Sequence, residues 1–117
     1  MSAIQPKLLY CRCAYAQVVP QSVKDGVLQK LCESGASFES VADLCEMAAH
    51  RDPRLKAFAE NAPLRIAACY PRVVRGLFRQ CDFPLPEEGA EILNMRVQTI
   101  DEVATAMLQG ESLNLEP

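Results

Sequence analysis

The segment Leu64-Arg65-Ile66-Ala67-Ala68-Cys69-Tyr70-Pro71 decides the fold of this chain. Its first five residues are mostly apolar, which is typical of a strand covered on both faces of a sheet. Pro71 follows almost directly, and proline is favoured in the first turn of a helix. A buried strand that runs straight into a helix indicates a parallel sheet with helices packed against it.

Strand-like and helix-like segments alternate along the rest of the chain. Further strands are predicted at residues 8–13, 38–44 and 92–97, each followed by a helical pattern. This alternation predicts right-handed crossovers and the strand order 2-1-3-4. We therefore expect one small α/β domain over residues 1–111, with a tail at 112–117. It would have a four-stranded, mostly parallel sheet with helices on both faces, similar in arrangement to flavodoxin or thioredoxin.

Helix ends are marked by short polar motifs. Ser22 with Asp25 and Thr99 with Glu102 have the spacing of capping boxes. Gly35 is expected to stop the first helix, because glycine adopts the left-handed conformation common at helix ends.

Composition limits the function classes. The 117 residues are 50% apolar and 23% charged, with a net charge of −3, as in one globular domain. No broad basic face is expected, so nucleic acid is not a predicted partner. No apolar run approaches the roughly 18 residues of a membrane span, and no membrane partner is predicted. The N-terminus lacks the pattern of a secretory signal, so we expect a cytoplasmic protein with reduced thiols.

Cysteines end three of the predicted strands. Cys11 and Cys13 close the first, Cys45 the second and Cys69 the third. With strand one between two and three, their carboxyl ends are adjacent, at the edge where open α/β sheets place ligands. Four converging thiols predict a metal or iron–sulfur site.

The cysteine spacing favours a cluster over other uses. Cys11 and Cys13 face the same side of a strand, roughly 6.5–7 Å apart, which suits a multi-iron cluster better than a single zinc ion. Gaps of 31 and 23 residues separate Cys13, Cys45 and Cys69, so a cluster would be held by the fold and not by a local loop. A zinc or thiol–disulfide module remains open as an alternative, as does an interaction domain with buried cysteines.

The sequence also predicts the place or role of four further residues. Arg72 begins a helix beside Cys69 and is expected to offset thiolate charge or donate to cluster sulfurs. Cys32 falls among apolar residues and is expected in the core, while Cys81 ends a helix and should point away from the site. His50 has no visible acidic partner, so no catalytic role is expected for it.

The stretch Cys69-Tyr70-Pro71-Arg72, preceded by Ile66-Ala67-Ala68 and followed by Leu77-Phe78, resembles part of the heterodisulfide reductase A-subunit family. Cys45 and Cys11 resemble that family's earlier cysteines, and the resemblance spans about residues 8–80. It implies an iron–sulfur cluster in a small α/β domain that passes electrons to a redox partner protein. Ligation by four thiolates predicts the 4Fe–4S type. The chain lacks the family's flavin domain and ferredoxin repeats, so an accessory electron-transfer module is implied rather than an enzyme on its own.

Overall fold

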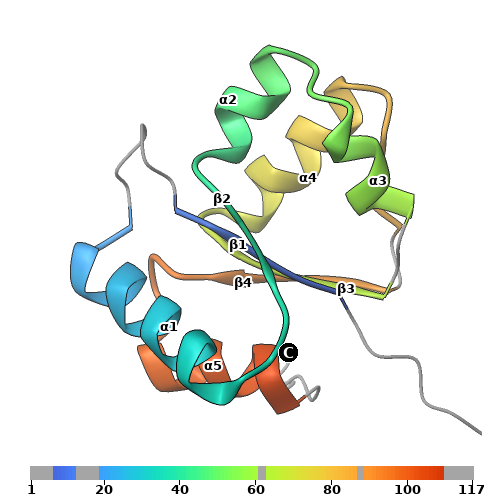
Figure 1. Cartoon of the computed structure of the whole chain (residues 1–117). Coiled ribbons are helices and arrows are strands. Elements are labelled where there is room, and N and C mark those ends of the chain that lie inside the picture. The colour runs from blue at the N-terminus through green and yellow to red at the C-terminus, as the bar shows by residue number, and fades with distance from the viewer. Residues whose placement is uncertain (1–6, 13–18, 61–62, 87–88, 110–117) are drawn as a thin grey trace, which may run out of the picture.

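The computed structural model describes residues 7–12, 19–60, 63–86 and 89–109 (Figure 1). Strands and helices alternate over most of this length, as expected. In chain order the elements are β1 (Lys7–Cys11), α1 (Gln21–Ser34), β2 (Glu39–Val41), α2 (Leu44–Ala49), α3 (Arg54–Glu60), β3 (Leu64–Ala68), α4 (Pro71–Gln80), β4 (Ala90–Asn94) and α5 (Ile100–Gln109).

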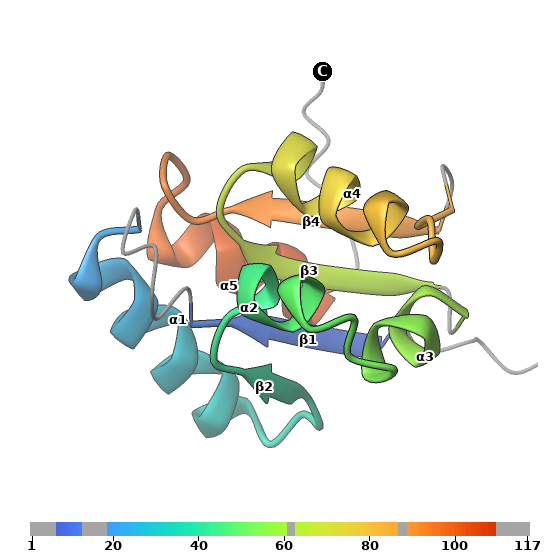
Figure 2. The same cartoon turned by 90° about the horizontal axis from the view of Figure 1, so that it is seen from above.

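The strands form one sheet in the order β2-β1-β3-β4, with all three neighbouring pairs parallel. The predicted fold class and strand order are therefore confirmed. Cys11 at the end of β1 lies in register with Val41 at the end of β2, and Tyr10 lies in register with Ala67 of β3. Because every pair is parallel, all carboxyl ends lie at one edge of the sheet (Figure 2). We call it the carboxyl edge.

Helices cover both faces of the sheet, as predicted. Helices α1 and α5 lie on one face, and α2, α3 and α4 lie on the other (Figure 1). The side chains of Leu9, Ile66 and Phe78 are fully buried in the core. The buried Tyr10 hydroxyl donates to the Lys24 carbonyl oxygen at 2.7 Å, which ties the central strand to α1. None of the helices in the described part of the chain combines the length and apolar character that crossing a bilayer requires.

Two of the predicted helix ends are confirmed. The backbone N–H of Thr99 donates to the Glu102 carboxylate at 2.9 Å, and the N–H of Glu102 donates to the Thr99 hydroxyl at 3.1 Å. These reciprocal bonds form the expected capping box before α5. Gly35 ends α1 in the left-handed conformation, with φ of 79°.

The predicted cap of α1 is wrong. The helix begins at Gln21 with Pro20 at its N-cap, and no side chain caps it. The Pro20 carbonyl accepts from the N–H groups of Val23 and Lys24, both at 3.1 Å, and so begins the helix one residue before Ser22. Asp25 instead accepts from the Gln21 side-chain amide at 2.9 Å.

Three predicted strands have different limits. β1 spans Lys7–Cys11 instead of residues 8–13. β2 ends at Val41, because the chain turns into the unpredicted helix α2. β4 spans Ala90–Asn94 instead of residues 92–97, because a turn follows Asn94, whose side chain accepts from the N–H of Arg96 at 2.9 Å. The predicted limit at residue 111 and the tail at 112–117 lie outside the described residues.

Replacing either of two helical glycines by alanine is expected to change stability in opposite directions. A Cβ built on Gly26 of α1 would overlap Ile100 Cδ1 and lie 2.8 Å from Ile100 Cγ1, whereas one built on Gly76 of α4 meets nothing within 4 Å. We expect Gly76→Ala to raise the free energy of unfolding by about 0.5–1 kcal/mol, because alanine favours helix. Gly26→Ala should lower it by about 1–3 kcal/mol, because overpacking exceeds that gain. Urea unfolding followed by circular dichroism measures both, and equal effects would contradict the close packing of α1 on α5.

Candidate functional site

Two of the predicted cysteine ligands lie buried at the carboxyl edge. Cys11 is the last residue of β1 and Cys69 directly follows β3, with 2% and 7% of their surfaces exposed. Their strands are hydrogen-bonded neighbours, spaced about 4.8 Å apart in parallel sheets. The strand order thus brings together two cysteines that stand 58 positions apart in the sequence.

Cys45 reaches the same edge from a helix. The expectation that it ends a strand is wrong, because it is the second residue of α2. The buried Asp43 carboxylate accepts from the N–H groups of Cys45 at 2.9 Å and Glu46 at 3.3 Å, which fixes the start of the helix. The N–H of Leu44 donates to Cys11 Sγ at 3.4 Å. The turn before α2 therefore packs against the end of β1.

Electrostatics show that the three thiols are neighbours. The pKa of Cys45 is raised to about 11, first by partial burial of the thiol, then by the negative charge of Asp43, then by Cys69 and Cys11. Cys45 is the exposed member of the three. Since Cys69 and Cys11 both act on Cys45, these three predicted ligands lie within electrostatic range of one another.

The fourth predicted ligand, Cys13, lies outside the described residues. Within residues 7–12, 19–60, 63–86 and 89–109, no three His, Cys, Asp or Glu side chains are grouped as ligands of one metal ion. Cys11, Cys45 and Cys69, as the structure describes them, therefore do not form a ligand set for one metal ion.

Arg72 is exposed in the first turn of α4, two residues after Tyr70. Tyr70 in turn contacts Arg96, whose guanidinium carbon lies 4.1 Å from the centre of the ring. Sequence reasoning missed Arg96, because the contact forms only when the turn after β4 lies beside the end of β3. The strand order was the one signal that places those two segments together.

Cys32 and Cys81 lie apart from this group. The prediction that Cys32 is in the core is wrong: α1 buries Lys24, Val27 and Leu31, and Cys32, about 100° further around the helix, is exposed. Cys81 is buried at the end of α4 and donates from Sγ to the Ala48 carbonyl oxygen at 3.5 Å.

A hollow of about 250 Å³ lies beside the outer strand β2 and helices α2 and α3. Contrary to expectation, His50 does have an acidic partner there, with its Nε2 atom 2.8 Å from Glu46 Oε2. Arg54 likewise donates to Asp52 at 2.9 Å. The charged groups of this hollow thus pair with one another. Its lining residues are Ser40, Val41, Ala42, Asp43, Glu46, Met47, His50, Asp52 and Arg54.

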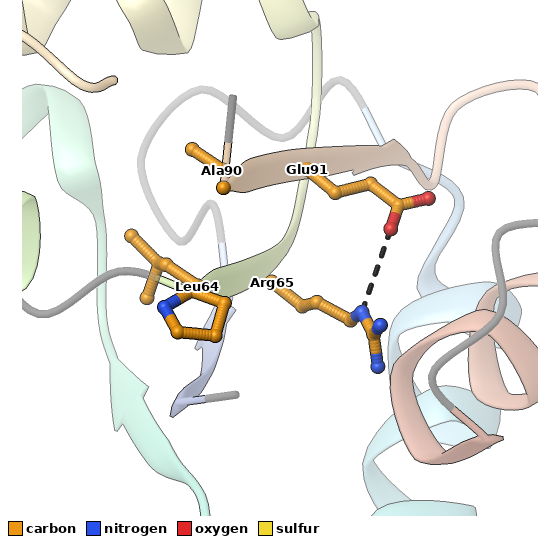
Figure 3. A pocket seen from close by; sticks show the side chains of 6 residues that line it. Leu64, Arg65, Ala90 and Glu91 are labelled. Carbon is orange, nitrogen blue, oxygen red and sulfur yellow. Dashed lines mark ion pairs between the residues drawn. The ribbon is translucent and has the colours of Figure 1, made fainter. Parts of the chain in front are cut away.

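A smaller hollow of about 170 Å³ lies at the opposite, amino end of β3 and β4 (Figure 3). Arg65 and Glu91 stand in register on the two strands, with Arg65 Nε 3.4 Å from Glu91 Oε1. This ion pair joins the outer strand to its neighbour and is remote from the cysteines.

Comparison with protein-family models, curated proteins and solved structures finds no match to this chain. The resemblance to the heterodisulfide reductase A-subunit family thus stays a hypothesis, and any function has to be inferred from the carboxyl edge itself.

The raised pKa of Cys45 predicts its reactivity. A thiol with a pKa of about 11 is almost fully protonated at pH 8, so alkylation by iodoacetamide should be slow and rise about tenfold per pH unit up to pH 10. The same pKa shift affects stability. The Cys45 thiol ionises at lower pH in the unfolded chain than in the folded one, so the free energy of unfolding should fall as pH rises above about 9. Mass spectrometry of the apo protein, resolved by peptide, gives the rate at Cys45. A rate that levels off near pH 8 would contradict the pKa.

Asp43→Asn separates the helix-capping role of Asp43 from the effect of its charge on the pKa of Cys45. Asparagine keeps an oxygen that can cap α2 but removes the charge beside Cys45. We expect alkylation of Cys45 at pH 8 to become faster, because the pKa falls, while the helix content stays the same. Exposed Cys32 on α1 serves as the internal control in the same digest. An unchanged Cys45 rate relative to Cys32 would show that burial alone raises the pKa.

Proposed function

We propose that this chain is a small iron–sulfur protein or electron-transfer module, with a 4Fe–4S cluster as its cofactor. The thiolates of Cys11, Cys13, Cys45 and Cys69 would be the ligands. The observation that supports this function best is the convergence of Cys11, Cys45 and Cys69 at the carboxyl edge. Since the three come from separate elements, their meeting depends on the fold and not on a local sequence motif.

The chemistry of the donor set fits such a cluster. Cysteine thiolates are the usual ligands of iron–sulfur clusters, and N–H···S bonds to the ligands tune their potential. The N–H of Leu44 already makes a bond of this kind to Cys11 Sγ. The burial of Cys11 and Cys69 limits access of water. When bound, the cluster would supply one-electron transfer.

Charge around the edge supports the same function. A cluster with four thiolates carries net negative charge, which nearby cations stabilise. Arg72, in the first turn of α4 just after Cys69, would supply part of that positive charge. We further propose a cytoplasmic location and a redox partner protein, because free thiols persist in reducing compartments.

Metal and sulfide analysis tests the function. Protein purified without air should be brown and contain about four irons and four sulfides per chain. Cys69→Ser should lose most of both, because it removes a ligand held by the central sheet. Cys32→Ser is the matched control, since Cys32 is exposed on α1, and it should keep the cluster.

Three outcomes would count against the cluster. A colourless anaerobic protein without iron or sulfide rejects it. Stoichiometric zinc that is lost in Cys69→Ser would support a zinc module instead. A mass lower by two hydrogen atoms after mild oxidation, without any metal, would support a thiol–disulfide module.

A further inference from the structure

Exposed apolar side chains gather at the carboxyl edge. Among the described residues, four large apolar side chains are exposed, and three of them are Tyr70 (39%), Val73 (43%) and Val97 (69%). Tyr70 and Val73 follow β3, whereas Val97 follows β4, the strand beside it. Figure 2 shows both of these chain segments leaving the sheet at the same end.

Arginines accompany these apolar residues. Arg72 is exposed on the first turn of α4, and Arg96 is half-buried over Tyr70. Arg12 adds a further exposed cation at the end of β1. The residues that follow β1, β3 and β4 are thus basic, whereas the buried Asp43 follows β2, and the whole chain has a net charge of −3.

The acids of the neighbouring segments are engaged elsewhere. Glu46 pairs with His50 at 2.8 Å, and Asp101 pairs with Lys30 at 3.5 Å. Glu102 caps α5 through the N–H of Thr99. None of these contacts is directed to Arg72 or Arg96.

The position of Arg72 is electrostatically unfavourable for the isolated chain. The N-terminus of a helix carries partial positive charge, so an acid is favoured there and a cation is disfavoured. α4 has no acid in its first turn. Helix stability therefore does not explain an arginine beside an exposed valine in that turn, and a negative partner would offset its charge in addition to the proposed cluster.

We propose that Tyr70, Arg72, Val73, Arg96 and Val97, here called the edge patch, dock an acidic protein. The composition fits a protein partner, because aromatic residues and arginine are enriched at protein interfaces. Two arginines beside two valines are too few cations, and too much aliphatic surface, for binding that depends on a phosphate backbone. The stacked Arg96 is held in place before binding, which reduces the entropy lost on docking.

This inference rests on the proposed function, since the acidic protein would be the electron-transfer partner. Tyr70 is the residue next to Cys69, so a partner on the edge patch would lie beside the cysteine site. Complementary charge would speed encounter and orient the two redox centres.

The test uses an acidic plant-type [2Fe–2S] ferredoxin as the probe and basic cytochrome c as the counter-probe. Binding to the full chain, purified without air, is measured by calorimetry at ionic strengths of about 0.01 and 0.15 M. Ferredoxin should bind, and more weakly at the higher salt.

Arg72→Glu with Arg96→Glu should weaken binding at low salt at least about tenfold. The matched control, Lys56→Glu with Arg79→Glu, changes the net charge equally on exposed residues of α3 and α4, and should weaken binding less than about twofold.

The following outcomes would overturn the inference that the edge patch docks an acidic protein. Wild-type protein that does not bind ferredoxin, equal loss in the two double variants, or tighter binding of cytochrome c would each do so. Tighter binding of poly-uridylate or anionic vesicles through the same arginines would assign the patch to another class of partner. Iron and sulfide are assayed in the same samples. Suppose that the protein contains no iron and that only the Arg72→Glu, Arg96→Glu variant loses ferredoxin binding. That result would reject the proposed function but support the edge patch as a docking surface.

Discussion

The pairing of β1 with both β2 and β3 is the constraint on which the carboxyl edge depends. Because β1 is central, the chain must cross over it between β2 and β3, and α2 and α3 make that crossover. The turn before α2 then lies against the end of β1, where the Leu44 N–H meets Cys11 Sγ. A slip of one residue in β1 would move Cys11 to the face covered by α1 and separate it from Cys45 and Cys69.

Asp43 stabilises the start of α2 but disfavours the thiolate form of Cys45. Its carboxylate satisfies two backbone N–H groups at the start of α2, which would otherwise lack partners at a buried turn. The same charge raises the pKa of Cys45 to about 11 and so disfavours the thiolate. The cap is therefore favourable for α2 and unfavourable for negative charge at Cys45.

The sequence predicted those features that depend on local pattern. The limits of β3 and the start of α4 follow from an apolar run ended by Pro71, and the cap of α5 from Thr99 and Glu102. The start of α2 was missed although Asp43 and Glu46 have capping spacing, because the apolar residues before Cys45 also fit a strand. The contact of Arg96 with Tyr70 was missed, since it joins turns after two different strands, which only the predicted strand order places side by side. Cys13 lies outside the described residues, so its place in the site stays a prediction.

The three predicted ligands that the structure describes differ in burial and in the element that holds them. Cys11 and Cys69 belong to the paired central strands and are buried, whereas Cys45 is exposed on a helix of six residues. The central sheet therefore fixes the side of the site that holds Cys11 and Cys69, whereas Cys45 is positioned by the Asp43 cap of α2. Tyr70 and Arg72 of the edge patch lie on the fixed side, after β3. A partner docked there would contact the end of β3, where Arg72 would serve both the charge of the cluster and the docking of the partner.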